Sequence, residues 1–402
     1  MNDAAAPGRR AADGRNLRIG FDAIRAFRNR TGLGNYARGV LRALHQLDPT
    51  LDLHLYSPWG PRREYAGLAD ELRAHVHVPA AGLAGRPAGS LWREFRAGRA
   101  ARRDGVQLYH GLTHVMPRDL PGTGIPAVVT FHDLIVEELP TLFRRFDRWS
   151  YRRRFRWSAR HADAIVAVSH ATRQALIDRY HVDPDRISVI PPPRDVRFAA
   201  SPSAAALDAV RQKYRLPPRY LLSVGTLEAR KNQQVLLDAL ARPGAGASLP
   251  LVLVGRDGGR AVMLRRAAQE LGIADRVWIE TGVDAADLPA VMHGAAVFLY
   301  PSLMEGFGMP IVEALSAGVP VVAASGGHLD DAAGPGSWYA SPQDPAAWAE
   351  AIARLLGDDG AAARLRAAGV AHAATFDPGR VAEALLDLYD QVVTIRPGRA
   401  EW

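Results

Sequence analysis

Short apolar runs rich in β-branched residues recur along the whole chain, and helical patterns separate most of them. The runs are continuous rather than alternating, as expected for strands that are buried on both faces of a parallel sheet. Strands that alternate with helices at this spacing predict doubly wound α/β units. The runs form two sets, residues 17–22, 51–57, 75–79, 106–110, 127–133, 164–169 and 187–191, then residues 220–225, 251–255, 277–282, 297–302, 319–324 and 337–340. Two Rossmann-like domains are therefore expected.

The length of the chain and one proline-rich segment predict where the domains divide. A chain of 402 residues exceeds what a single hydrophobic core usually organises. Residues 191–203 combine three consecutive prolines with small polar residues and predict a linker. We expect a disordered tail over 1–16, an N-terminal Rossmann-like domain over 17–195, a C-terminal one over 196–378, and a C-terminal helix over 379–402 that packs back on the N-terminal domain.

Charge is distributed unevenly along the chain. Residues 1–200 hold 32 arginines against 20 acidic residues, a balance of +12, whereas residues 201–402 balance at −4 and leave +8 overall. The positive half favours an anionic partner, either nucleic acid or a membrane surface. A general preference for arginine over lysine, 48 to 2 in this chain, explains the asymmetry equally well.

Several classes of site and location are excluded by composition. The chain has no cysteine, so disulfides, thiolate metal sites and a cysteine nucleophile are ruled out. No group of histidines and carboxylates shows the spacing of a metal site. No apolar stretch approaches the roughly 20 residues that span a bilayer, and residues 1–16 lack the apolar core of a signal peptide. We therefore expect a cytoplasmic protein, with peripheral contact to the inner face of the plasma membrane as a further option.

The most informative segment is 301–324, which follows a predicted strand. Its chemically informative residues are Glu305, Gly306, Phe307, Gly308, Pro310 and Glu313. The glycines let backbone amides approach an anion at the start of a helix that the proline opens, which favours a diphosphate site. Glu313 can accept hydrogen bonds from a ribose diol, and Glu305 lies toward the group beyond the diphosphate. The alternative is a glycine turn with two solvated glutamates, which this spacing makes less favourable.

A second basic motif, Arg230 and Lys231, follows a predicted strand that ends at Gly225. A guanidinium fork and a neighbouring ammonium group suit a diphosphate, because they neutralise it as a leaving group. The alternative is a solvated basic turn. With only two lysines in the chain, a lysine at this position favours binding.

Two further features lie in the first half. His132 ends a predicted strand, where it can donate to a sugar hydroxyl or contact the reacting centre, and the next residue, Asp133, can orient it. A lone histidine at such a position is more often structural. Gly32 and Gly34 form a Gly-x-Gly turn before a helical pattern, which alone is weak evidence for phosphate binding.

Together these segments resemble family 4 of the retaining glycosyltransferases, whose GT-B fold has two facing Rossmann-like domains with a cleft between them. The segment from Glu305 resembles the donor-site signature E-G-F-G-x-P-x-x-E-A, followed by G-x-P-V-V. Other matching segments follow in the order of the family, at residues 32–36, 130–134, 162–169 and 224–232. The resemblance covers residues 17–393 and is strongest to bacterial mannosyltransferases and rhamnosyltransferases of surface-polysaccharide and lipopolysaccharide assembly.

The resemblance also implies roles for individual residues. Catalytic roles fall to His132, Glu305, Arg230 and Lys231. Donor contacts fall to Gly32, Gly34, Gly225, Arg230, Lys231, Gly255, Val283, Glu305, Gly306, Phe307, Gly308 and Glu313. The resemblance implies that the enzyme needs no cofactor and no metal, and that a nucleotide sugar is its co-substrate. The chain departs from the family at Thr226, where many members have arginine, and at residues 328–332, which replace a proline–glutamate–valine turn.

A basic run covers residues 144–160, with eight arginines against one acidic residue and interleaved Phe, Trp and Tyr. The aromatic residues at 146, 149, 151 and 157 predict one face of a helix, and we expect that face to pack in the core. The arginines favour anionic lipid headgroups or a polyprenyl-diphosphate acceptor over nucleic acid.

These features predict a retaining enzyme that transfers a hexose to a glycan or lipid-linked acceptor. GDP-mannose is the expected donor. Two alternatives stay open: a sugar-nucleotide epimerase of the same fold, and a nucleic-acid-binding protein that uses the basic N-terminal half. We expect no nucleic-acid partner, because nothing else in the sequence resembles a nucleic-acid-binding module.

Overall fold

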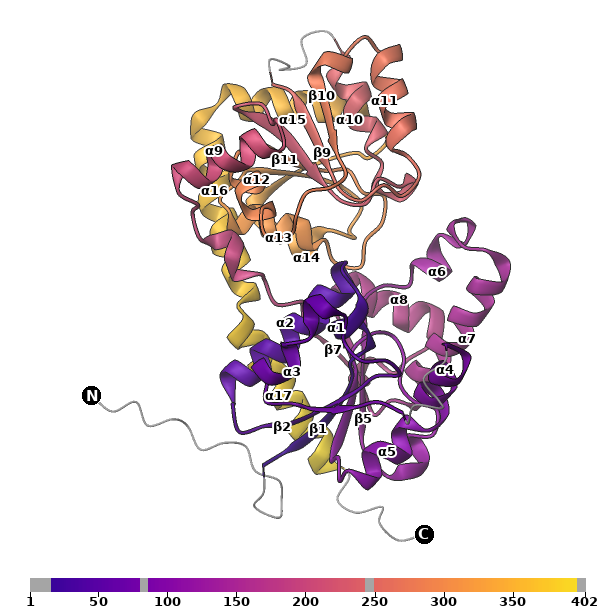
Figure 1. The fold of residues 1–402 in the computed structure, drawn as a ribbon. Helices are drawn as coiled ribbons and strands as arrows, with labels where there is room; N and C mark the ends of the chain where they lie inside the picture. Colours follow the sequence, from indigo (N-terminus) through magenta and orange to yellow (C-terminus); the bar gives the residue numbers. More distant parts are fainter. Residues whose placement is uncertain (1–15, 80–85, 243–248, 396–402) are drawn as a thin grey trace, which may run out of the picture. The chain divides into compact units, whose positions relative to one another are not determined.

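The computed structural model of the protein describes residues 16–79, 86–242 and 249–395 (Figure 1). The tail expected over residues 1–16 lies outside this part of the chain except for Asn16. The chain divides into two compact units, which we describe separately. Unit 1 extends to Pro193 and resumes at Asp377, and unit 2 is Arg194–Phe376. These bounds lie within two residues of those expected from the sequence.

Unit 1 is built on a seven-stranded parallel sheet with the strand order β3-β2-β1-β4-β5-β6-β7. Six of these strands fall within the apolar runs and β4 extends one residue beyond its run, so this part of the sequence prediction is confirmed. The strands are β1 Arg18–Asp22, β2 Asp52–Tyr56, β3 His75–His77, β4 Leu108–Gly111, β5 Ala127–Phe131, β6 Ala164–Ala167 and β7 Ile187–Val189.

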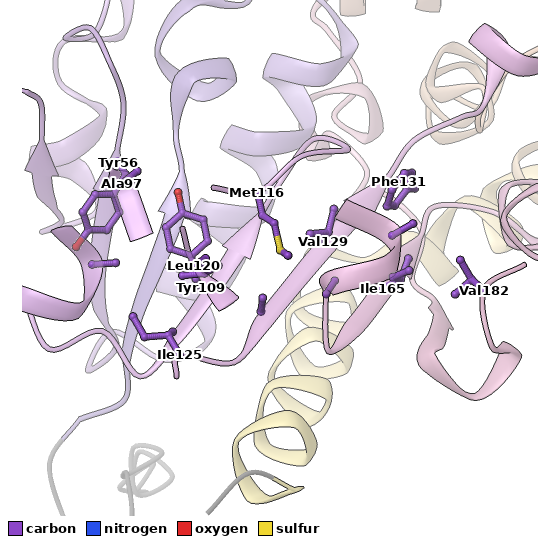
Figure 2. Packing of buried hydrophobic residues seen from close by; sticks show 14 of the residues in the cluster. Tyr56, Ala97, Tyr109, Met116, Leu120, Ile125, Val129, Phe131, Ile165 and Val182 are labelled. Carbon is purple, nitrogen blue, oxygen red and sulfur yellow. The ribbon is translucent and has the colours of Figure 1, made fainter. Parts of the chain in front are cut away.

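Helices cover both faces of this sheet. They are α1 Ile24–Arg28, α2 Gly32–Leu47, α3 Leu68–Glu71, α4 Arg86–Phe95, α5 Ala97–Arg103, α6 Ile135–Glu138, α7 Arg145–His161, α8 His170–Tyr180 and α17 Pro378–Ile395. On one face, side chains of β2, β4, β5 and β6 pack with those of α4, α5, α7 and α8, and Figure 2 shows part of this core. Alternate strand residues such as Tyr109, Val129 and Ile165 point into it, as the two-residue period of a strand requires.

The opposite face carries α2 and α17, which pack against each other. Helix α17 is the last segment along the sequence, the yellow helix among the indigo and magenta elements of unit 1 in Figure 1. A buried polar network attaches it to the sheet. His110 Nδ1 lies 2.6 Å from Tyr389 Oη, and His110 Nε2 lies 2.8 Å from Thr130 Oγ1, which is 3.0 Å from Tyr36 Oη of α2. Burial lowers the pKa of His110 to about 3, so this imidazole is neutral.

Unit 2 has a six-stranded parallel sheet in the order β10-β9-β8-β11-β12-β13. Its strands are β8 Tyr220–Val224, β9 Leu251–Val254, β10 Val277–Glu280, β11 Ala295–Tyr300, β12 Val321–Ala324 and β13 Ser337–Ala340. Its helices are α9 Ala204–Lys213, α10 Gln234–Leu240, α11 Ala261–Glu270, α12 Leu288–His293, α13 Met309–Ser316, α14 Asp330–Ala333, α15 Pro345–Gly357 and α16 Asp359–Ala373. Both units are therefore Rossmann-like, as predicted.

Each sheet reverses its strand order at one place. In unit 1 the reversal lies between β1 and β4, and in unit 2 it lies between β8 and β11. At such a place the loops that leave the two strands run in opposite directions and open a crevice at the carboxyl edge, where doubly wound sheets bind ligands. The fold thus selects the loops after β8 and β11 in unit 2, and those after β1 and β4 in unit 1.

Among the described residues, no helix combines the length and apolar character that crossing a membrane requires.

We predict that Tyr389→Phe lowers the free energy of unfolding by about 1–3 kcal/mol, because it leaves the buried Nδ1 of His110 without its partner. Urea unfolding of parent and variant measures this. Tyr339→Phe, which removes a hydroxyl from a tyrosine that is 40% exposed in unit 2, is the control. Equal stabilities of parent and Tyr389→Phe would show that the network does not hold α17.

Candidate functional site

Two loops meet at the carboxyl edge of the unit 2 sheet. The first follows β8 and contains the short 3₁₀ helix Ala229–Lys231. The second follows β11 and leads through Glu305 to α13. Because β8 and β11 are neighbours at the reversal, these loops bring the predicted basic pair and the predicted glutamate together.

Glu305 pairs with both cations of the first loop. Its Oε1 lies 2.5 Å from Lys231 Nζ and 2.8 Å from Arg230 Nη1, and it also accepts a hydrogen bond from Ser302 Oγ. Arg230 further donates to the Met304 carbonyl oxygen at 2.6 Å and pairs with Glu228 at 2.7 Å. Sequence reasoning brought Arg230, Lys231 and Glu305 to one site but did not predict that the carboxylate joins the two cations.

This cluster is largely buried, and its carboxylate stays charged. Burial opposes ionisation of Glu305, but Lys231 and Arg230 outweigh it and lower the pKa of Glu305 to about 2. Burial lowers the pKa of Lys231 below its ordinary value, although the attraction of Glu305 partly offsets this. At neutral pH Glu305 is therefore a carboxylate, which excludes it as a proton donor.

Two residues that the sequence analysis did not single out hold the cluster in place. Asn232 has a left-handed backbone (φ 54°), and its Nδ2 donates to the carbonyl oxygens of Pro301 at 3.2 Å and Pro342 at 2.8 Å. Tyr300, the last residue of β11, accepts a hydrogen bond from Lys231 Nζ at 2.7 Å. Asn232 follows the basic pair directly, and asparagine tolerates the left-handed conformation, so its position was a usable signal.

Helix α13 begins at Met309, which makes Pro310 its second residue rather than its first. Gly308 precedes it with φ 107°, a conformation that favours glycine. Gly306 lies in the same loop, so its backbone can approach a ligand at the start of the helix. Phe307 is 4% exposed and its ring lies 5.3 Å from that of Phe376, so it supports this loop from the core side.

Glu313 lies on α13 and is half-buried. Burial and the nearby Asp195 raise the pKa of Glu313 to about 7, and Arg197 only partly opposes them. Glu313 is therefore close to half-ionised at neutral pH.

Gly225 and Gly255 end two adjacent strands, β8 and β9. A Cβ built on Gly255 would lie 1.9 Å from the Gly225 carbonyl oxygen, so close backbone packing alone requires glycine at 255. A Cβ built on Gly225 would lie 3.4 Å from Lys231 Cε, which places Gly225 beside the basic pair. Val283 follows β10 at the same edge and is half-buried.

In unit 1, His132 follows β5 and is 8% exposed. Its Nε2 lies 2.9 Å from the Leu112 carbonyl oxygen and therefore carries the proton, and its ring meets that of Tyr36 edge-on at 4.5 Å. Burial and the adjacent His114 lower the pKa of His132 to about 3. Its Nδ1 is thus unprotonated and accepts hydrogen bonds, which corrects the expectation that His132 donates to a sugar hydroxyl.

His114 supports this histidine, and the Asp133 carboxylate bonds to the start of α6. His114 has φ 57°, stacks on Phe155 at 4.4 Å, and accepts through Nε2 from the amides of His132 at 3.2 Å and Asp133 at 3.3 Å. Asp133 Oδ1 accepts from the Ile135 amide at 3.1 Å, at the start of α6. The contacts of His114 and Leu112 thus position His132.

The glycine turn of unit 1 lies in the first turn of α2. A Cβ on Gly34 would lie 2.0 Å from the Asn29 carbonyl oxygen, whereas Gly32 has open space around it. Gly34 is therefore required by packing, and Gly32 is the one whose surroundings leave room for a ligand. Nearby, the buried carboxylate of Asp22 at the end of β1 pairs with Arg93 of α4.

Comparisons with known proteins show the family of this chain. A family model described as "Glycosyltransferase Family 4" matches residues 30–198, and one described as "Glycosyl transferases group 1" matches residues 208–372. The chain is 34% identical over 275 residues to "O-antigen chain mannosyltransferase B" of Escherichia coli, covering 67% of this chain and 70% of that protein.

Further relatives agree on the class. The chain is 34% identical over 251 residues to "D-inositol 3-phosphate glycosyltransferase" of Xylanimonas cellulosilytica, and the match spans 59% of each chain, little more than half of that relative. The crystal structure of Anabaena Alr3699/HepE in complex with UDP has the same fold, with a TM-score of 0.71 at 19% identity over 94% of this chain and all of that one.

We predict that Glu313→Gln changes stability in a pH-dependent way. The pKa of Glu313 is raised from 4.5 to about 7, so the folded chain keeps a proton that the unfolded chain releases, and parent stability falls as the pH rises between these values. Glutamine does not ionise. The variant should therefore gain up to about 3 kcal/mol on the parent between pH 4.5 and pH 8, at about 1.4 kcal/mol per pKa unit.

Urea unfolding at pH 5, 6, 7 and 8 provides the measurement. Glu270→Gln, on the exposed side of α11, is the matched control and should track the parent at every pH. A constant stability difference between Glu313→Gln and the parent across this range would contradict the raised pKa.

Proposed function

Because the chain belongs to glycosyltransferase family 4, we propose that it transfers a hexose from a nucleotide-diphosphate sugar, with retention of the anomeric configuration, to a glycan or lipid-linked acceptor. One observation carries this proposal: Arg230, Lys231 and the glycine-preceded start of α13 converge where the unit 2 sheet reverses its strand order. Such an edge, with two cations and the start of a helix, suits a diphosphate.

The basic pair stabilises the departing nucleoside diphosphate. Lys231 Nζ uses two of its three N–H groups on Tyr300 and Glu305, which leaves one for a phosphate oxygen. Arg230 adds a second fixed cation. The acceptor hydroxyl attacks from the face that the diphosphate leaves, and a phosphate oxygen takes its proton. Glu305 keeps both cations at the edge of the sheet, and the cations supply the charge that a metal ion would otherwise provide, so transfer needs no metal.

Glu313 and His132 take separate parts in binding. The ionised form of Glu313 accepts hydrogen bonds from the ribose diol of the donor. His132 Nδ1, kept unprotonated because Nε2 bonds to Leu112, accepts a hydrogen bond from a hydroxyl of the sugar or the acceptor.

For the donor we propose GDP-mannose. The O-antigen chain mannosyltransferase B named above supports mannose as the sugar, because its similarity extends over 70% of that protein. The structure of HepE with UDP makes a uridine donor the natural competitor. For the acceptor we propose a glycan carried on a polyprenyl diphosphate.

We predict that the purified protein hydrolyses GDP-mannose faster than any other sugar nucleotide in a panel of GDP-, UDP- and ADP-sugars. Lys231→Ala should lower the rate about 100- to 1,000-fold, because it removes a charge from the departing diphosphate. Glu313→Ala should chiefly weaken donor binding, because it removes the ribose contact. Release of the nucleoside diphosphate measures the effects of both substitutions.

The other lysine of the chain is the matched control. Lys213 is half-exposed and pairs with Asp284 and Asp287, outside the cluster of Arg230, Lys231 and Glu305, so Lys213→Ala should hydrolyse like the parent. A preference for a UDP-sugar would overturn the donor and leave the transferase proposal intact. Parent-like rates in both Lys231→Ala and Glu313→Ala would overturn the site.

A surface on α7 supports peripheral contact with an anionic membrane. Phe146 is 74% exposed and Trp149 56% exposed, which corrects the prediction that they lie in a core stripe; of the predicted stripe, Trp157 packs against the core. Arg153 lies over the Trp149 ring at 5.5 Å. Exposed aromatic rings beside exposed arginines match a bilayer interface with acidic headgroups, which suits the inner face of a plasma membrane.

We predict that the parent sediments with vesicles of phosphatidylcholine and phosphatidylglycerol and that salt weakens this binding. The double variant Phe146→Ser, Trp149→Ser should lose most of it, because it removes the inserting rings. Val262→Ser, at a residue 79% exposed in unit 2, should bind like the parent. Equal sedimentation of all three proteins would contradict contact through α7.

A further inference from the structure

A group of histidines and carboxylates converges at the open edge of the unit 1 sheet. Strand β3 is the edge strand and pairs in parallel with β2, with His54 opposite His75 and Tyr56 opposite His77. Side chains two residues apart on a strand share a face, so all these groups project from the same face. The converging side chains are Asp52, His54, His75, His77 and Asp104.

Three of these side chains have the separations of a metal site. His54 Nε2 lies 3.2 Å and His75 Nε2 lies 3.4 Å from the same oxygen, Asp52 Oδ1. All three atoms lie within 4.8 Å of one another. Ligand atoms about 2.0–2.1 Å from a tetrahedral zinc ion are roughly 3.3 Å apart, close to both distances.

The central histidine carries an unsatisfied nitrogen. His54 is 6% exposed, and its buried Nε2 has no hydrogen-bond partner among the described residues. Its other nitrogen, Nδ1, lies 2.8 Å from His77 Nε2. His77 Nδ1 lies 3.2 Å from Asp104 Oδ2, which also accepts from the Tyr56 hydroxyl at 2.7 Å.

The row of Asp52, His54, His77 and Asp104 lacks one proton for its hydrogen bonds. Three contacts join four groups, Asp52 to His54, His54 to His77, and His77 to Asp104, and the two neutral imidazoles supply only two N–H groups. One contact between a ring nitrogen and a carboxylate is therefore left without a proton, and when His54 donates to His77 and His77 donates to Asp104, it is the contact between His54 Nε2 and Asp52. A lone pair then faces a carboxylate oxygen in a buried place, an arrangement that a cation would satisfy.

We propose that Asp52 Oδ1, His54 Nε2 and His75 Nε2 bind a zinc ion. The surroundings fit this role. Arg18 Nε holds the other oxygen of Asp52 at 2.7 Å, and the row from His54 to His77 and Asp104 orients the ligating ring, as outer hydrogen bonds do in zinc sites. The side chain of His75 is 64% exposed, so an ion can enter from solvent and keep a water as its fourth ligand.

The ion would join β2 to the edge strand β3 and so stabilise unit 1. The sequence predicts no metal site, because the ligands come from two strands about 20 residues apart and only the parallel register places His54 beside His75. The donor residues of unit 2 take no part in this site. Zinc binding can therefore be tested separately from the proposed sugar transfer.

The test uses the full chain without a histidine tag. Titration calorimetry with zinc chloride should give one ion per chain, and cobalt(II) should give the visible absorption of a four-coordinate site. His75→Ala should weaken zinc binding at least tenfold, because it removes a ligand. This substitution is on an exposed side chain, so the fold should survive it; Asp52→Asn is the second variant, and thermal unfolding without zinc verifies that both fold.

His161→Ala, which removes an exposed histidine of α7, is the matched control and should bind zinc like the parent. Zinc should raise the thermal midpoint of the parent and of His161→Ala but not that of His75→Ala. Absence of a stoichiometric site in the parent would overturn the proposal. Parent-like affinity in folded His75→Ala and Asp52→Asn would overturn it as well.

Discussion

Parallel pairing makes all strands of a unit end at one edge of its sheet. The loops that carry the candidate site residues of unit 1 and unit 2 depend on this constraint. Strands β8 and β11 are far apart in sequence but are neighbours where the order reverses, so Lys231 and Glu305 meet across 74 residues. Gly255 has no room for a side chain, because the backbones at this edge are so close. The buried Glu305 is tolerated because two cations and a hydroxyl surround it.

Most of the fold could be predicted because the evidence for it is local. A continuous apolar run such as residues 251–254 fits a strand buried on both faces, and the parallel sheets follow from the repetition of such runs. The positions of Arg230, Lys231 and Glu305 relative to strand ends are local as well. The partners of Asp22 and His110 were not predictable, because Arg93 and Tyr389 lie 71 and 279 residues away and no periodicity links them.

Helix α7 shows where periodicity misleads. The aromatic spacing correctly identifies a helix, and Trp157 packs on the core as expected. Periodicity tells which side chains share a face, but burial also requires another element opposite that face along its whole length. Phe146 and Trp149 occupy the first turns of the helix and remain exposed. The protonation of His132 was unpredictable for a similar reason, because it depends on the carbonyl group of Leu112, which belongs to another strand end.

Helix α17 completes unit 1 although it follows the whole of unit 2 in the sequence. The hydroxyl that satisfies His110 and the apolar side chains that face α2 are therefore synthesised after the whole of unit 2. Unit 2 is continuous from Arg194 to Phe376 and has all its residues available before α17 leaves the ribosome. The order of completion during synthesis is thus the reverse of the order in which the units begin, and a chain that stops before Asp377 lacks part of its first domain while its second is whole.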